Sequence, residues 1–125
     1  MPEVTKPPTG EYPQPAKMHH LDLQAAAEQL KAKLPGNRRQ TKSLARESGV
    51  SIIMMAMEAG DVVEEHSAPG IVTIQLVDGH AILVADGETI DLWPGELLVF
   101  QPGLVHNLRA EEQSVVVLTI TGGDE

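Results

Sequence analysis

The sequence predicts a mainly β fold, an antiparallel barrel or sandwich, with one helix near the N-terminus. From residue 38 onward, short hydrophobic segments alternate with turns that contain glycine. The pairs Asp78-Gly79 and Asp86-Gly87 favour tight β-hairpins, because these residue types accept the left-handed backbone that such turns need. Many short strands at even spacing are typical of a sandwich or barrel, and closure into a barrel removes exposed strand edges.

Residues 1–20 are predicted to form a proline-rich arm. Five of the nine prolines in the chain lie before residue 16. Proline lacks a backbone N–H and biases the preceding residue towards extended conformations, so neither regular helix nor sheet is expected here. In an oligomer, such an arm could lie across a neighbouring copy.

Residues 21–37 are predicted to contain a helix that packs on the outside of the sheet structure. Asp22 is a suitable N-cap, because its side chain can accept a hydrogen bond from the first turn. Pro35-Gly36 ends the helix. Between these limits an apolar stripe recurs at helical spacing, made of Leu23, Ala26, Ala27, Leu30 and Leu34.

The predicted barrel occupies residues 38–125. The whole chain has 125 residues, which falls within the usual size of one domain, about 100–150 residues. We expect strands near residues 38–46, 50–58, 61–67, 70–77, 80–86, 89–92, 97–101, 104–110 and 114–121.

The charge balance disfavours nucleic acid and membranes as partners. The chain has 18 acidic and 9 basic residues, whereas clustered positive charge supplies most of the attraction to such surfaces. No segment approaches the ~20 apolar residues of a membrane span, and no apolar run typical of a signal peptide follows Met1. Cysteine is absent, which excludes disulfides and thiolate metal sites. We therefore expect a cytoplasmic protein.

Two segments of the predicted barrel have a specific spacing of glycine and histidine. The first contains Gly60, His66-Ser67-Ala68, Val72 and Gly79, and the second contains Gly95, Gln101-Pro102-Gly103 and His106. These segments resemble the two motifs of the cupin family, and the resemblance covers about residues 50–121. It implies an antiparallel cupin β-barrel (a double-stranded β-helix, or jelly roll) of the small single-domain type (cupin 2 conserved barrel, RmlC-like).

The resemblance also implies where a metal would bind. In cupins, two histidines and a glutamate of the first motif, with a histidine of the second, usually hold one divalent ion. His66 and His106 match the first and last of these ligands, but Ala68 and Val72 replace the other two. Alanine and valine offer no lone pair to a metal, so the standard cage is not expected. The alternative is one zinc, nickel, iron or manganese ion held by His66 and His106.

Glu64 is the candidate for a third ligand. Residues two apart on a strand share a face, so Glu64 has the same parity as His66. Glu64, His66 and His106 would form a two-histidine, one-carboxylate set, a type suited to non-haem iron. The competing interpretation is that Glu64 is a solvated residue at the start of its strand.

The remaining candidate ligand-binding residues are apolar: Val72, Ile74, Met55, Met57 and Phe100. Val72 and Ile74 share the inward parity of the strand that they occupy, and the methionines add adaptable apolar surface nearby. A barrel with two histidines at one end and apolar walls suits a small, partly apolar molecule with one polar group.

The sequence thus leaves two main functional hypotheses, beside a third, a purely structural or partner-binding role, which no exposed interaction motif supports. The first is a small-molecule binding protein whose barrel lacks the standard metal cage. The second is a divalent-metal-dependent enzyme of dioxygenase or isomerase type that uses His66 and His106. No catalytic residue is assigned. His19, His20 and His80 are interpreted as surface residues. Trp93 either contributes to the ligand site or anchors a turn or a subunit contact. By resemblance to small cupins, we expect a homodimer.

Overall fold

The computed structural model describes residues 14–122, except for the side chains of Glu65 and His66. Its elements, in chain order, are α1 (Leu23–Lys31), β1 (Arg39–Glu47), β2 (Val50–Met57), β3 (Val62–His66), β4 (Val72–Asp78), β5 (Ala81–Ala85), β6 (Glu88–Leu92), β7 (Leu97–Phe100), β8 (His106–Ala110) and β9 (Ser114–Thr121). Each of these strands lies within a few residues of its predicted position. The first 13 residues of the predicted proline-rich arm lie outside the described part.

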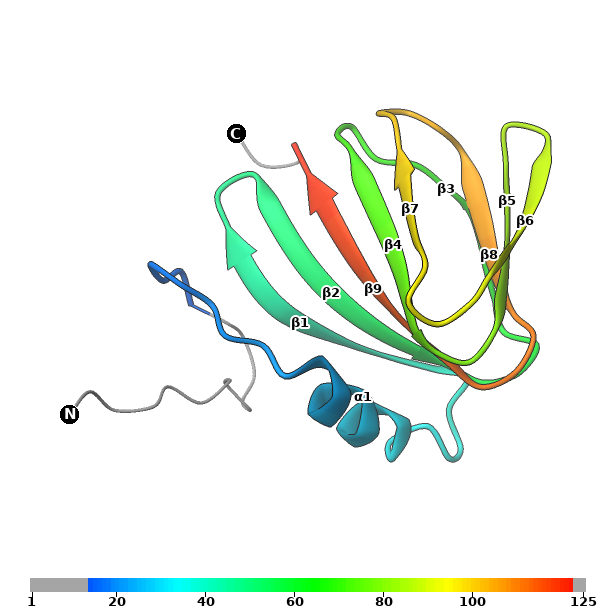
Figure 1. Cartoon of the computed structure of the whole chain (residues 1–125), viewed down its shortest axis with the longest axis horizontal. Coiled ribbons are helices and arrows are strands. Elements are labelled where there is room, and N and C mark those ends of the chain that lie inside the picture. Colours follow the sequence, from blue (N-terminus) through cyan, green and yellow to red (C-terminus); the bar gives the residue numbers. More distant parts are fainter. Residues whose placement is uncertain (1–13, 123–125) are drawn as a thin grey trace.

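Two antiparallel sheets face each other (Figure 1). The five-stranded sheet has the order β1-β2-β9-β4-β7, and the four-stranded sheet has the order β3-β8-β5-β6. All pairs are antiparallel, so the predicted mainly β antiparallel fold is confirmed. Within residues 14–122, no helix is both long and apolar enough to cross a membrane.

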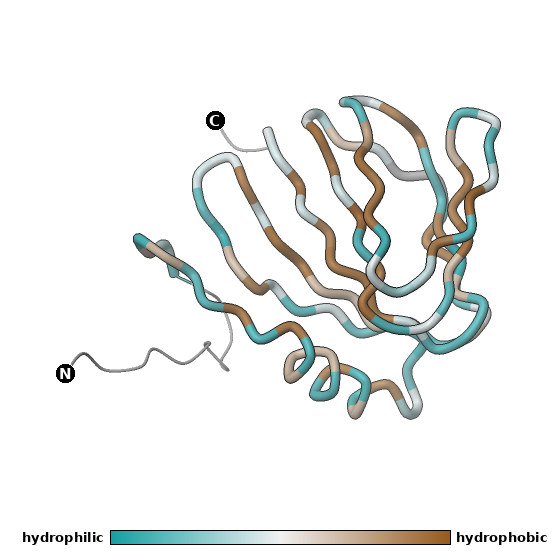
Figure 2. Tube along the Cα trace, viewed as in Figure 1, coloured by the Kyte–Doolittle hydropathy of each residue, from teal (hydrophilic) through white to brown (hydrophobic). Residues whose placement is uncertain are grey.

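The inner core lies between the two sheets. It contains Met55, Met57, Val72, Ile74, Leu76, Ala81, Leu83, Ala85, Leu92, Phe100, Leu108, Ala110 and Val116. These residues come from both sheets and alternate with outward-facing residues along each strand, as one buried face requires. In Figure 2 hydrophobic colour runs along β2, β4 and β9, while much of β1 is hydrophilic.

Helix α1 covers part of the outer face of the five-stranded sheet. The side chain of Asp22 accepts a hydrogen bond from the Ala25 N–H at 3.0 Å, which confirms its capping role. Buried Ala27, Leu30 and Leu34 pack against the outer side chains of β2 and β9, among them Met54 and Val115.

The helix ends at Lys31, before its predicted end at Pro35-Gly36. After Lys31 the backbone N–H groups of Lys33 and Leu34 bond to carbonyls three residues earlier, at 3.1 Å each. This tightened turn satisfies the last helical carbonyls and still brings Leu34 into the outer core.

The two aspartate–glycine turns behave differently. Asp86 and Gly87 both have positive φ, 53° and 74°, and join the paired strands β5 and β6 in a two-residue hairpin, as predicted. The hairpin prediction at Asp78-Gly79 is wrong, because β4 pairs with β7 and β9 whereas β5 pairs with β6 and β8.

Gly79 instead lets the chain pass from one sheet to the other. Its φ is 98°, and a Cβ there would clash with the Gln113 carbonyl oxygen and with Ser114. Ser114 closes this crossing, because its hydroxyl accepts a hydrogen bond from the His80 N–H at 3.1 Å.

Candidate functional site

His106 is the centre of the candidate site. It is the first residue of β8 and only 5% exposed, and its ring stacks on Phe100 at the end of β7. Its Nδ1 lies 3.2 Å from the carbonyl oxygen of Leu104. A carbonyl oxygen only accepts, so this contact makes Nδ1 the donor, and a neutral ring then has its lone pair on Nε2.

His66 is the last residue of β3, and the strand register places it directly opposite His106. Residues in such register pairs lie on the same face of a sheet. The two histidine positions are therefore neighbours on adjacent strands. The side chain of His66 lies outside the described side chains, so contact between the two imidazoles stays a prediction.

The structure does not bring Glu64 to the inner face. Val63 pairs with Leu108 and packs against the inner core, and the register shifts between Val63 and His66. This bulge breaks the alternation from which the position of Glu64 was predicted. Glu64 is exposed instead. The physical reason is one extra residue in β3 relative to its partner β8.

The positions of the two missing cupin ligands are filled by apolar groups. Val72 is 5% exposed at the start of β4, and Ala68 is partly buried against the inner core. The Ala68 carbonyl oxygen accepts a hydrogen bond from the Gly103 N–H at 2.9 Å, which joins the segment after β3 to the segment after β7. The donor set of the standard cage is therefore not present, and the residues here do not fit a four-ligand cupin metal centre.

The described side chains do not form a metal site of their own. Among the side chains that the structure describes, which do not include His66, no group of three histidine, aspartate or glutamate residues could hold a metal ion.

The five predicted apolar residues do come together. Met55, Met57, Val72, Ile74 and Phe100 belong to one buried cluster between the sheets. They extend from Phe100, which contacts His106, to Met57, which pairs with Arg39 near the far end of β2. Phe100 among them stacks on the His106 ring.

Several residues of this region were not predicted from the sequence. Leu98, Leu104, Leu118 and Ile120 are only partly buried and pack against the same cluster. The alternation of Val116, Leu118 and Ile120 in the last strand could have indicated two of them. The role of Leu104 depends on its carbonyl oxygen, for which a sequence carries no signal.

A second histidine, His80, packs against other side chains away from this site. His80 is half-buried, stacks on Trp93 with ring centroids 3.8 Å apart, and its Nε2 lies 2.7 Å from Asp91 Oδ1. The prediction of a solvent-facing His80 is therefore corrected, because Trp93 covers one face of the ring. His80 follows the end of β4 and Trp93 follows the end of β6, whereas Val72 and His106 lie at the start of β4 and of β8.

A buried ion pair lies just before the start of β3, at the opposite end of this strand from His66. The Asp61 side chain is fully buried and accepts two hydrogen bonds from Arg39, at 2.8 and 3.0 Å. The hydrogen bond to Asp61 raises the pKa of the Arg39 guanidinium. The pair ties β1 to the turn before β3, so its role is structural.

Comparisons with known proteins agree with this architecture. A family model described as a cupin domain matches residues 53–121. The chain belongs to the cupin family. No curated protein sequence matches it. Membership fixes the barrel and the position of the motif residues, while Ala68 and Val72 distinguish this cupin from those with the four-ligand cage.

Solved structures of low sequence identity share the fold. A cupin superfamily protein from Desulfitobacterium hafniense is 21% identical, with a TM-score of 0.66 over 68% of this chain and 78% of that chain. A conserved protein of unknown function from Streptococcus pyogenes is 23% identical, with a TM-score of 0.64 over 70% of this chain and 76% of that chain.

Enzymes also occur among the similar structures. Salicylate 1,2-dioxygenase from Pseudoaminobacter salicylatoxidans is 16% identical, with a TM-score of 0.66 over 79% of this chain and 31% of that chain. At these identities the likeness establishes the cupin fold of the present protein and nothing about its chemistry.

Proposed function

We propose that this cupin binds a small, largely apolar molecule with one polar group at the His106 end of its barrel, without the standard metal cage. The observation that carries the proposal is the setting of His106. A buried imidazole is held in orientation by the Leu104 carbonyl and the Phe100 ring, at the edge of an apolar interior.

The surroundings of His106 favour such a ligand. Binding sites for small molecules are mostly apolar, with a few placed polar groups that fix the orientation of the ligand. Here the partly buried Leu104, Leu118 and Ile120 supply aliphatic surface that a ligand could cover further. His106 supplies the polar group, and the chemistry that it recognises is a hydroxyl or carboxyl attached to an apolar body.

The test is a ligand screen by NMR with isotope-labelled protein. The probes are aromatic carboxylic acids and medium-chain alcohols, each added with and without a chelator. We expect saturable shifts in residues around His106 that persist with the chelator, and roughly tenfold weaker binding by His106→Gln. His80→Gln is the matched control, since His80 belongs to the separate cluster with Trp93. Equal affinity in the wild type and His106→Gln would refute the proposal.

A second candidate is a divalent-metal-dependent enzyme of dioxygenase or isomerase type. The observation that favours it is the direct register pairing of His66 with His106, which supplies two imidazole positions on adjacent strands. Zinc, nickel, iron and manganese accept imidazole ligands, and Glu64, the third ligand expected from the sequence, is exposed.

Metal content separates the two candidates. Untagged protein purified without chelators is compared with the double variant His66→Ala, His106→Ala by mass spectrometry. Near-stoichiometric metal in the parent and none in the variant would support the enzyme candidate, whereas a metal-free parent would exclude it under those conditions.

A further inference from the structure

Two rows of residues cross the inner face of the five-stranded sheet beside the candidate site. Residues that pair directly across neighbouring strands lie on the same face of a sheet. From β7 to β1, the pairing gives a first row of Phe100, Val72, Ile120, Ser51 and Arg46 and a second row of Leu98, Ile74, Leu118, Ile53 and Ser43. The first row contains the ring that stacks on His106, so it marks the His106 end of the barrel.

The burial of these two rows falls towards β1. In β4, Val72 and Ile74 are 5% and 1% exposed. Their row neighbours in β9 and β2 are only partly buried, and Arg46 in β1 is exposed. One row deeper in the barrel, Leu76 and Val116 are fully buried, so the interior is already filled there. The inner face at the His106 end therefore opens towards β2 and β1.

The side chains along this opening change from apolar to polar. The inner strip, as we call this part of the two rows, consists of Ile53, Leu118, Ile120, Ser51 and Arg46. The first three are aliphatic, Ser51 adds a hydroxyl, and Arg46 adds a guanidinium. A guanidinium binds a carboxylate through two parallel hydrogen bonds, and a neighbouring hydroxyl can donate a third. The inner strip therefore has the chemistry of a site for an acid with an aliphatic body.

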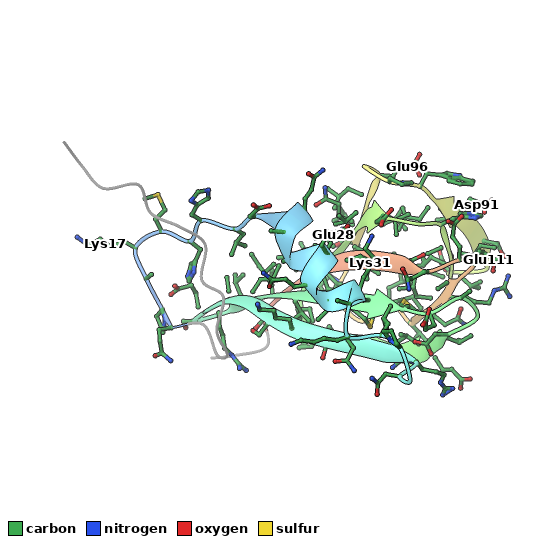
Figure 3. The ribbon with its side chains drawn as sticks, turned by 90° about the horizontal axis from the view of Figure 1, so that it is seen from below. Lys17, Glu28, Lys31, Asp91, Glu96 and Glu111 are labelled. Carbon is green, nitrogen blue, oxygen red and sulfur yellow. The ribbon has the colours of Figure 1, made fainter. Side chains whose placement is uncertain are left out.

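Arg46 lies on the opposite face of β1 from the contact with the arm. The next residue, Glu47, accepts a hydrogen bond from the Ala16 N–H at 2.8 Å, and adjacent residues of a strand point to opposite faces. Figure 3 shows three acidic residues together at the far end of the molecule from the arm residue Lys17: Asp91, Glu96 and Glu111. Charges further apart than about 8 Å are largely screened at physiological salt, so this acidic group does not oppose an anion at Arg46.

We propose that the inner strip binds the carboxylate and the aliphatic chain of an elongated acid. The carboxylate accepts hydrogen bonds from Arg46 and Ser51, and the chain covers the three aliphatic residues. β4 and β1 are three strand spacings of about 4.8 Å apart, so a ligand that reaches from Val72 to Arg46 is roughly 14 Å long. The inference rests on the proposed function for the opposite end of the ligand, where a hydroxyl contacts His106. The ligand class is then a straight-chain hydroxy acid.

The two ends of such a ligand are not interchangeable. His106 is 5% exposed and stacks on Phe100 at the edge of an apolar interior, where a carboxylate would lose its hydration. Arg46 is exposed, and a guanidinium is charged at every physiological pH. A carboxylate beside Arg46 gains a charged partner and keeps part of its hydration. The hydroxyl of the ligand therefore lies at His106 and the carboxylate at Arg46.

The experiment is a calorimetric titration with straight-chain molecules that have a hydroxyl at one end. The other end is either a carboxylate or a second hydroxyl, at equal chain length. We expect the wild type to bind the hydroxy acid more than about tenfold more tightly than the diol, and Arg46→Gln to abolish this preference. The matched control is Arg109→Gln, which removes the same charge from the outer face of β8, next to the inner-core residue Leu108. Thermal unfolding verifies that both variants are folded.

Chain length is a second readout, and it needs no variant. Each added methylene that becomes buried against the inner strip should strengthen binding of the hydroxy acid to the wild type about fourfold. The gain should stop once the chain reaches from His106 to Arg46. An affinity that does not depend on chain length would overturn the contact with the aliphatic residues.

The remaining outcomes separate this inference from the proposed function. Equal affinity of the wild type for the hydroxy acid and the diol would overturn the inference. A preference for the acid that Arg46→Gln retains, or that Arg109→Gln also loses, would overturn it as well. If His106→Gln binds both probes as tightly as the wild type and still prefers the acid, the proposed function fails and the inner strip stands as an acid site of its own.

Discussion

Phe100 and His106 lie in stacked contact across the two sheets, with ring centroids 4.6 Å apart and an angle of 23° between the ring planes. Phe100 ends β7 in the five-stranded sheet, and His106 begins β8 in the four-stranded sheet. The contact therefore joins the two layers at the end of the barrel where both cupin motifs meet.

Replacement of Phe100 should change the environment of His106 more than the stability of the fold. Phe100→Leu removes the aromatic ring but keeps most of the volume, and such exchanges usually cost less than about 1.5 kcal/mol. We expect the ring resonances of His106 to shift in NMR spectra while the urea midpoint changes little.

Met57→Leu serves as the control for this variant, because Met57 belongs to the same cluster but lies near the far end of β2. It should leave the His106 resonances in place. The stacking assignment is wrong if Phe100→Leu does the same.

Loss of the Asp61 carboxylate should destabilise the barrel strongly. Asp61→Asn keeps the shape of the side chain but leaves Arg39 without its charged partner, and breaking a buried ion pair costs about 3–5 kcal/mol. Because Arg39 is 36% exposed, we expect the lower end of that range, about 3 kcal/mol, in urea unfolding.

Glu111→Gln is the comparison for Asp61→Asn. It removes the partner of Arg109 in a pair whose side chains are 51% and 34% exposed, so the loss should stay below about 1 kcal/mol. Similar losses for both variants would mean that Asp61 has no special structural role.

The end of the arm should detach from β1 as the pH falls. Hydrogen bonds from the Ala16 N–H and from His19 hold the pKa of Glu47 below its ordinary value of 4.5. A carboxyl with a lowered pKa stabilises the docked arm above that ordinary value, and the stabilisation is lost as the pH falls through the lowered pKa. The amide resonance of Ala16, followed by NMR, should therefore move below pH 4.5.

Glu47→Ala should leave the Ala16 amide at its undocked position at every pH. In Glu88→Ala, a change at an exposed position in β6, the Ala16 amide resonance should respond to pH as it does in the wild type. A wild-type Ala16 resonance that does not respond to acid would contradict the docking contact.

The strands could be predicted because glycine turns divide the sequence from residue 38 onward. Whether a turn joins two paired strands could not always be predicted. Asp86-Gly87 makes the predicted hairpin, but the similar pair Asp78-Gly79 leads into the other sheet, because β9 and β7 occupy both edges of β4. Whether such a turn forms a hairpin depends on which distant strands pair with its neighbours, and the residues of the turn do not indicate this pairing.

The candidate site could be predicted only in part. The motif glycines and histidines indicated His66 and His106, and the parity of Val72 and Ile74 indicated the inner core. Glu64 was placed by the same parity rule and is exposed, because the bulge after Val63 adds a residue without a sequence signal. The stacking of His80 on Trp93 depends on the turn between β6 and β7, which sequence spacing does not fix.

The position of β9 has a consequence for how the chain folds. β9 lies between β2 and β4 in the five-stranded sheet, so it pairs with two strands that end much earlier in the chain, at Met57 and at Asp78. Neither neighbour can complete its hydrogen bonds until residues 114–121 are available. Such long-range pairing slows folding, because loop-closure entropy must be overcome before the contacts form. During synthesis the β1–β2 hairpin and β4 therefore lack their partner strand until β9 has been made. Until then their apolar faces stay exposed, where chaperones can bind them or other chains can aggregate with them.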